Sequence, residues 1–429
     1  MTAITFAIAF ACALAVMVGT RLWLSRRHVA HIAAHRDRVP QAFVERVALP
    51  AHHKAADYTT AKQSLRRVET IVDALLLCLL TFGGGIGLLI AWTGRLPVGA
   101  LWQDVALIGA LALVSAASSL PFSWYSTFGV EQRFGFNRTS MPMWFADLAK
   151  GTALSLVLGL PLLVLVLWLM RGSGEWWWLW TWMSWTGFQL LVLVLYPTLI
   201  APIFNRFEPL PAGETRTRVE TLLARCGFAS SGLFVMDGSK RSGHGNAYFT
   251  GLGRAKRVVF FDTLLARLSG DELEAVLAHE LGHFKLRHVI KRIVWSAFVS
   301  LAFLALLAWL MQRAWFSAGL GIPEALVAEA MSRPGVALAL FALVVPVFLF
   351  LLSPLASLYS RKHEFEADAF AARTASAPAL AQALVKLYED NAATLTPDPL
   401  HSAFYDSHPP ATIRVARLKS LAATLAGNR

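Results

Sequence analysis

The chain has 429 residues, of which 56% are hydrophobic and only 15% are charged, and its mean hydropathy is +0.52. Soluble domains contain roughly 45–50% apolar and about 25% charged residues, so this composition excludes an ordinary soluble protein and predicts an integral membrane protein. The net charge of +12 would suit a nucleic-acid ligand, but the basic residues are sorted by loop and form no binding stripe, so we expect no nucleic-acid partner.

Seven long windows contain no Asp, Glu, Lys or Arg, and each reaches the roughly 20 residues that cross a hydrocarbon core of about 30 Å. One such window alone could be a buried helix of a soluble protein, but seven together predict seven transmembrane helices. The first window is followed by Arg21-Leu22-Trp23 and not by a small-residue cleavage site, so we expect a retained span rather than a signal peptide. The windows are 1–20, 74–94, 105–130, 151–170, 176–205, 293–312 and 334–360.

The basic residues predict the orientation of these spans. Of the 39 Lys and Arg residues, 35 fall in the loops of one side, and the other side receives only Arg95, Arg171, Arg313 and Arg333. By the positive-inside rule, the basic side faces the cytoplasm. We therefore expect a multi-pass protein of the cell (inner) membrane, with the N-terminus outside and the C-terminus and catalytic segments in the cytoplasm.

Four parts follow from this topology. The two cytoplasmic segments lie on the same side of the membrane and are separated only by a hairpin of two spans, so we expect them to join into one cytoplasmic domain. The tryptophan-rich run at 176–185 is typical of an interfacial aromatic belt. The parts are 1–205 (a membrane domain of five spans), 206–292 (the first cytoplasmic segment), 293–360 (the transmembrane hairpin) and 361–429 (the second cytoplasmic segment).

The first cytoplasmic segment has an α+β pattern. GLFVMDG at 232–238 and AKRVVFFDTLL at 255–265 are rich in Val and Phe and predict short strands. SGDE at 269–272 then places a serine three residues before a glutamate, ahead of an apolar period, which predicts a capping box. The helix that it starts should run from Gly270 to about Arg287.

This helix carries the sequence LAHELGHFKL, which contains HExxH. Residues four apart lie on one helical face, so His279 and His283 can present their imidazoles to one ion, while Glu280 lies beside them as a general base. Zinc suits imidazole ligands, and a catalytic zinc site uses three protein ligands and one open position. One ligand is therefore still missing.

The second cytoplasmic segment begins with SRKHEFEADAFAAR at 360–373. Glu364 and Asp368 are four residues apart and share a helical face. Such acids alone are typical of a solvated surface, but beside two histidines Glu364 is the natural third ligand. Asp368 is then placed to accept an N–H from a ligating imidazole.

Together these motifs resemble the integral-membrane zinc endopeptidases of the type I CAAX prenyl protease family. The similarity rests on HELGH, on HEFEAD at 363–368 and on the order of four further motifs across about residues 60–417. The resemblance implies a mainly α polytopic fold of seven transmembrane helices with a cytoplasmic zincin-like α+β catalytic domain. The further motifs are FGVEQRFGFN (128–137), YPTLIAPIFNRF (196–207), GNAYFTG (245–251) and DSHPPATIR (406–414).

The same resemblance implies roles for individual residues and one Zn²⁺ per chain, with His279, His283 and Glu364 as ligands and Glu280 as general base. Asn246 and His408 match positions that bind the peptide and stabilise the oxyanion, and Arg414 matches an arginine near that site. Asn246 could instead only hold a turn, and His408 could be a helix-entry residue. The remaining candidates, His244, His288, His363 and His401, are not expected to be ligands. His288 in particular lies five residues beyond His283, which on a helix turns it away.

The expected activity is hydrolysis of peptide bonds in a CAAX-type or other membrane-associated peptide or protein, prenylated or not, by a metal-activated water. The strand near 257–262 could pair with an extended substrate. Membrane-protein quality control is an alternative activity. A zinc-binding scaffold or transporter is a second alternative, but a transporter should carry its ionisable residues within the spans.

Overall fold

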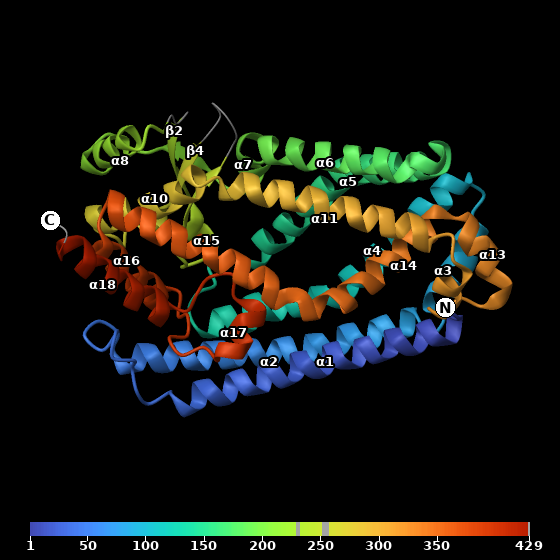
Figure 1. Ribbon diagram of the computed structural model, residues 1–429, viewed down its shortest axis with the longest axis horizontal. Helices are drawn as coiled ribbons and strands as arrows, with labels where there is room; N and C mark the ends of the chain where they lie inside the picture. The colour runs from blue at the N-terminus through green and yellow to red at the C-terminus, as the bar shows by residue number, and fades with distance from the viewer. Residues whose placement is uncertain (229–231, 251–256, 428–429) are drawn as a thin grey trace.

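The computed structural model describes residues 1–228, 232–250 and 257–427, and the chain forms an elongated molecule with most of its helices along the long axis (Figure 1). Six helical stretches are long and apolar enough to cross a membrane, and a bent pair of helices gives a seventh. Each stretch overlaps one of the seven charge-free windows, so the prediction of seven spans is confirmed with the bent pair counted as one span. The stretches are Ala3–Ala34 (α1), Leu49–Leu80 with Gly85–Gly94 (α2 and α3), Ala100–Glu131 (from α4), Met141–Gly172 (α5), Gly174–Phe204 (around α6), His288–Leu310 (α11) and Pro334–Thr374 (α14 and α15).

The second span is broken where the sequence reads Phe82-Gly83-Gly84-Gly85. The helices α2 and α3 meet there at an angle of 54°. Gly84 has a φ of +75°, a conformation that side chains with a Cβ rarely adopt, and it is the N-cap residue of α3. The window 74–94 is therefore one bent span and not a straight helix.

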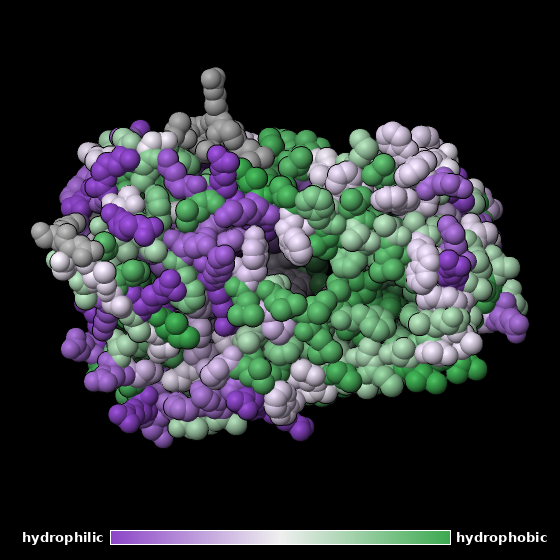
Figure 2. Space-filling view, viewed as in Figure 1, coloured by the Kyte–Doolittle hydropathy of each residue, from purple (hydrophilic) through white to green (hydrophobic). Residues whose placement is uncertain are grey.

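The apolar surface is concentrated on one half of the molecule. In Figure 2 the half that carries the long spans is mostly hydrophobic, the catalytic half is mostly hydrophilic, and the surface is hollowed where the two meet. Large apolar side chains on three spans are well exposed, among them Leu113, Val157 and Phe298. Such a contiguous apolar surface needs a lipid environment.

The polar half contains a four-stranded sheet with helices packed against it. The strands are β1 (Phe207–Pro209), β2 (Gly232–Met236), β3 (Ala247–Thr250) and β4 (Arg257–Phe261), in the order β1-β2-β4-β3. Strands β2 and β4 are the two that the sequence predicts, and they pair in parallel. The predicted strand residues 255 and 256, and residue 251 of GNAYFTG, lie outside the described residues.

The position of β4 contradicts the expectation that this strand pairs with a substrate. Both of its edges are occupied, by β2 on one side and by β3 on the other. Among the strands that the structure describes, β3 pairs only with β4 and is an edge of the sheet. β4 is therefore a central strand, with Val258, Val259 and Phe260 all buried, and the expected pairing of residues 257–262 with a substrate is wrong.

The two segments predicted to be cytoplasmic, 206–292 and 361–429, share one hydrophobic core. Leu222, Phe260 and Leu277 from the first segment pack in one cluster with Leu384 and Leu418 from the second. The helices of the first segment are α8 (Glu214–Arg225), α9 (Asp262–Leu265) and α10 (Gly270–Lys285). Those of the second are the C-terminal part of α15 (Ser353–Thr374), α16 (Ala377–Asp390), α17 (Pro399–Tyr405) and α18 (Ala411–Gly427).

The connection between α1 and α2 also reaches this core. Both helices have 32 residues, which corresponds to about 48 Å. They lie side by side along one edge of the molecule (Figure 1) and extend as far as the catalytic half. Phe43 and Val47, between them, are buried in the catalytic core. The N-terminal membrane part therefore contributes directly to that core.

A buried ion-pair network joins three spans at the opposite end of the molecule. Asp104 on α4 is fully buried and accepts hydrogen bonds from Arg333 (2.9 Å), Arg171 and the backbone N–H of Gly335 (3.0 Å). Two of the four arginines that the sequence places on the outer side are thus paired with one carboxylate. The short helices α12 (Ala314–Ala318) and α13 (Glu324–Ser332) connect the last two spans at this end.

Replacing Asp104 by alanine should lower the thermal unfolding temperature of the detergent-purified protein substantially. Removing one partner of a buried charge pair costs about 3–5 kcal/mol, because the other charge stays buried without compensation. Glu329→Gln is the control, since this carboxylate also contacts Arg333 but is 41% exposed and should contribute about 0–1 kcal/mol. Equal unfolding temperatures for the two variants would show that the network does not stabilise the fold.

Candidate active site

The helix that carries HELGH is built as the sequence predicts. Ser269 Oγ accepts a hydrogen bond from the Glu272 N–H (3.4 Å), and a Glu272 carboxylate oxygen accepts one from the Ser269 N–H (2.8 Å). The capping box is therefore confirmed. Lys386 on α16 adds an ion pair to the same carboxylate at 2.6 Å, which fixes the start of α10 against α16.

Small residues let α10 and α15 approach each other closely. Ala278 and Ala367 are fully buried between them. A Cβ added to Gly282 would lie only 3.0 Å from the Ala367 Cα. The glycine inside HELGH thus permits the helix contact that brings the two predicted halves of the metal site together.

The three predicted ligands meet in one small triangle. His279 Nε2 lies 3.3 Å from His283 Nε2, and each of these atoms lies 3.4 Å from a different carboxylate oxygen of Glu364. A tetrahedron with metal–ligand bonds of about 2.0–2.1 Å has edges of about 3.3–3.4 Å. The spacing therefore fits a zinc ion with two imidazoles and one carboxylate.

The surroundings of Glu364 agree with a cation at this position. Glu364 is only 5% exposed, and its Oε2 atom has no hydrogen-bond partner among the residues that the structure describes. A buried carboxylate oxygen without a donor is costly unless an ion satisfies it. The donor set and this unsatisfied atom together fit a divalent metal.

Asp368 and Arg414 hold the imidazole of His279 on the side of the ring that faces away from the other ligands. An Asp368 carboxylate oxygen lies 2.9 Å from His279 Nδ1, on the side of the ring opposite Nε2. Arg414 donates two hydrogen bonds to the same carboxylate, at 2.6 and 2.9 Å, and all three side chains are buried. The predicted contact of Asp368 with a ligating imidazole is present, and Arg414 holds Asp368 in place.

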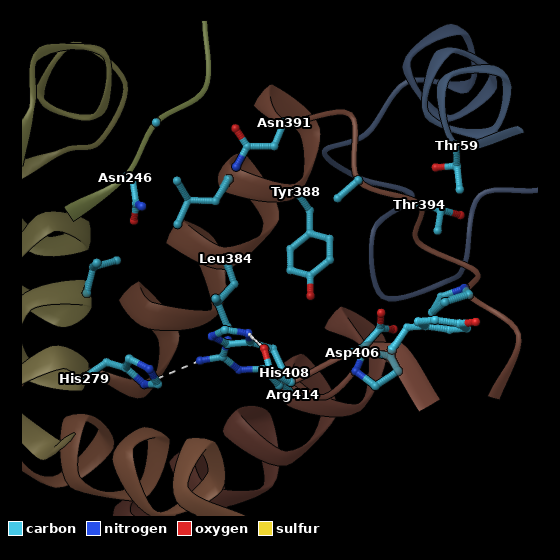
Figure 3. Close-up of a pocket in the computed structure, with 18 of the residues that line it drawn as sticks. Thr59, Asn246, His279, Leu384, Tyr388, Asn391, Thr394, Asp406, His408 and Arg414 are labelled. Atoms are coloured by element: carbon cyan, nitrogen blue, oxygen red, sulfur yellow. Dashed lines mark hydrogen bonds between the residues drawn. The ribbon is translucent and has the colours of Figure 1, made fainter. Parts of the chain in front are cut away.

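The predicted substrate-side residues line a common cavity of about 600 Å³. Figure 3 shows Asn246 and His279 along one wall and His408 near Arg414. His408 Nε2 lies 3.4 Å from Glu364 Oε1, and its side chain is 59% exposed. Asn246 also holds its local turn, because its Oδ1 accepts a hydrogen bond from the Ala247 N–H at 2.9 Å directly before β3. Glu280 lines the same cavity.

A second cavity, of about 930 Å³, adjoins the first. The two share Asn246 and residues of α2 such as Gln63, and the second extends to Phe122 and Ser126 on the third span. A connected space therefore runs from the metal-ligand cluster toward the membrane helices.

The protonation of the three HELGH side chains follows from burial and neighbouring charge. Burial lowers the pKa of His279, but the facing carboxylates of Asp368 and Glu364 outweigh this effect and raise that pKa to about 9. Burial and the nearby His279 lower the pKa of His283 to about 3. Burial raises the pKa of Glu280, which makes its carboxylate a stronger base than an exposed glutamate. The carboxylates that raise the pKa of His279 would also favour a cation between the ligands.

Two groups near the site were not expected from the sequence. Tyr388 on α16 points into the cavity in Figure 3, and burial raises its pKa. His288, expected to turn away, does lie outside the ligand triangle, but its Nδ1 is 3.0 Å from Nδ1 of His283. An apolar helix with one tyrosine gives no signal for Tyr388, whereas helical spacing turns His288 away from His283 and so does not predict their contact.

An HExxH helix, a distant glutamate and a general base beside a cavity at the end of membrane helices define a membrane metalloprotease. Comparison with known proteins agrees. Residues 28–206 match the family model of the CAAX prenyl protease N-terminal region with five membrane helices, and residues 209–422 match peptidase family M48. The chain belongs to this family of membrane metalloendopeptidases.

Curated relatives match over most of their length. The chain is 34% identical to CAAX prenyl protease 1 homolog of Arabidopsis thaliana over 88% of this chain and 89% of the relative. It is 35% identical to CAAX prenyl protease 1 of Saccharomyces cerevisiae (74% and 72%) and 31% identical to the Homo sapiens homolog (79% and 79%). The crystal structure of S. mikatae Ste24p superposes with a TM-score of 0.88 at 28% identity, covering 96% of this chain and 99% of that one. These similarities favour an enzyme over a metal-binding scaffold or transporter.

Proposed function

We propose that the chain is a zinc-dependent endopeptidase that cleaves CAAX-type substrates near their C-terminus on the cytoplasmic side of the inner membrane. The main support is the ligand triangle of His279, His283 and Glu364, in which the two imidazole Nε2 atoms lie 3.3 Å apart and each lies 3.4 Å from a carboxylate oxygen, close enough to hold one zinc ion next to a base that lines the substrate cavity. The names of the relatives support the substrate class. The proposed domains are the four parts inferred from the sequence, with 206–292 and 361–429 together forming the catalytic domain.

In this proposal His279, His283 and Glu364 hold one zinc ion per chain. When bound, zinc supplies Lewis acidity for the peptide carbonyl and acidifies a water molecule. Glu280 takes the proton of the attacking water and later delivers it to the leaving amine.

His408 and Asn246 face the same cavity from the opposite segments and donate hydrogen bonds to the substrate and to its developing oxyanion. Asp368 keeps His279 in the tautomer whose Nε2 is free to bind metal, and Arg414 keeps Asp368 in place. Strand β3, which starts just after Asn246, is the edge on which an extended peptide can be aligned.

The substrate class can be tested with the purified, zinc-loaded protein and two peptides. A farnesylated CAAX peptide and its unprenylated twin are incubated separately, and the products are identified by mass. We expect release of a C-terminal fragment from the farnesylated peptide at a higher kcat/KM, and no release after treatment with a chelator. Equal cleavage of the twins would favour a broader substrate class such as membrane-protein quality control, and no cleavage of either would contradict the proposed substrate class.

A further inference from the structure

His288 forms a bridge between a proposed zinc ligand and a carboxylate on the last transmembrane stretch. It is fully buried at the first position of α11. Its Nδ1 lies 3.0 Å from His283 Nδ1, and its Nε2 lies 2.9 Å from Glu366 Oε2. Both nitrogens of one buried imidazole therefore have polar partners, and neither partner is solvent.

The contacts determine which nitrogen of the His283 ring and of the His288 ring carries the proton. His283 Nε2 faces His279 and Glu364, so it must keep its lone pair free for the metal, and the proton is on Nδ1. The neighbouring His288 Nδ1 must then accept that N–H. The remaining proton of His288 is consequently on Nε2, where the carboxylate of Glu366 accepts it. A single assignment of tautomers satisfies all three contacts.

We propose that His288 is a positioning residue for the metal site, fixing the tautomer and the ring orientation of His283 through a hydrogen bond and being fixed in turn by Glu366. Asp368 makes the equivalent contact to His279. Partners of this kind orient a ligating imidazole, raise its basicity and contribute about 10–100-fold to metal affinity. This inference rests on the proposed zinc site.

The chain turn between α10 and α11 makes the contact possible. On a continuous helix, a residue five positions on is rotated by about 140°, which would point it away from His283. Arg287, however, has a φ of +58°, which ends α10 and starts α11 in a new direction at His288. α11 is a transmembrane stretch, and Glu366 lies on α15, which belongs to the last transmembrane stretch. The ring of His283 is therefore oriented by the packing of two membrane segments.

A second metal site is the competing interpretation of these residues. His288, His363 and Glu366 offer potential ligand atoms within 4.8 Å of one another. The rings of His288 and His363, however, are stacked at a centroid distance of 4.0 Å and an interplanar angle of 8°. The lone pair of an imidazole nitrogen lies in the plane of its ring, and one ion cannot lie in two parallel, separated planes. The arrangement therefore favours a hydrogen-bonded bridge capped by His363.

The test compares His288→Leu with His288→Asn in the full-length protein purified in detergent. Leucine fills the space without an acceptor, whereas the asparagine Oδ1 can take the place of Nδ1 and accept the His283 N–H. We expect the zinc dissociation constant, measured by competition with a chromogenic chelator, to rise about 10–100-fold in His288→Leu and markedly less in His288→Asn. The visible absorption bands of the Co²⁺-substituted protein should shift in His288→Leu.

Two further variants serve as references. His52→Leu removes another buried imidazole, on α2, whose Nε2 contacts the His35 carbonyl (3.0 Å) and no proposed ligand; it should leave zinc affinity unchanged. Asp368→Asn should also weaken zinc binding, because Asp368 contacts Nδ1 of the other imidazole, His279, as His288 contacts Nδ1 of His283. If His288→Leu fails to fold, Glu366→Ala replaces it, because this partly exposed position tolerates substitution better, and it should weaken zinc binding several-fold.

The possible results distinguish a failure of the proposed His288 bridge from a failure of the proposed zinc site. Zinc affinity and Co²⁺ bands like those of the parent in His288→Leu, or in Glu366→Ala when it is used instead, would overturn the bridge. An asparagine variant weaker than the leucine variant would reduce His288 to a packing residue. Two zinc ions per parent chain, falling to one in His288→Leu, would favour the second metal site. A parent protein that binds no zinc would instead refute the proposed function.

Discussion

Replacing Glu280 by glutamine should abolish peptide cleavage while the protein still binds one zinc ion. Glutamine keeps the size and the hydrogen-bonding reach of the side chain but cannot take a proton from water. Loss of a general base costs about 10²–10⁴-fold in rate. Because Glu280 is not a vertex of the ligand triangle, the metal content should not change. The measurements are kcat/KM on the farnesylated peptide and zinc per chain by elemental analysis.

Glu274→Gln is the matched control for this variant. Glu274 lies on the same helix, but it forms an ion pair with Arg225 at 2.9 Å and does not line the cavity. Its replacement should leave cleavage and zinc content unchanged. A Glu280→Gln protein that cleaves the peptide at the parent rate would remove the general base from the mechanism and would require another group in the cavity to accept the proton.

Much of the fold follows from local sequence patterns. The charge-free windows predict all seven spans, and the serine and glutamate at 269 and 272 predict where α10 begins. Each of these features lies within one continuous segment of the chain, so the sequence of that segment contains the information. The three ligands were also predicted to come together, because HExxH restricts the third ligand to a few chemical types and Glu364 follows the hairpin that returns the chain.

The features that the sequence did not predict depend on contacts between distant segments. The strand at 257–261 is apolar in any position of a sheet, and only the pairing of β3 with it makes it central. Arg414 could be placed near the site by resemblance, but its two hydrogen bonds to Asp368 require α18 to pack on α15. His288 follows Arg287, where the backbone leaves the helical region, so helical periodicity does not place its side chain.

The charge distribution around the ligands explains why the Glu364 carboxylate is needed to bind a divalent cation. Within 4 Å, Glu364 faces His279, His283, His408 and Arg414, all of which are neutral or positive. Asp368 is already committed to His279 Nδ1 and to the guanidinium. Glu364 is thus the one anionic group in the ligand triangle, and a divalent cation in a largely buried site needs it.

Replacing Glu364 by alanine should therefore remove zinc and activity together, in contrast to Glu280→Gln. Two imidazoles remain, and the Arg414 guanidinium, whose Nη1 lies 3.7 Å from Glu364 Oε2, then repels a cation without compensation. We expect zinc per chain to fall to background after dialysis and cleavage to fall at least as far as in Glu280→Gln, by more than about 10²-fold. Residual zinc would have to be held by a substitute ligand, and His408 is placed for this, since its Nε2 lies 3.4 Å from Glu364 Oε1. The double variant Glu364→Ala/His408→Ala should lose that remainder, and full zinc occupancy in the double variant would contradict the ligand triangle itself.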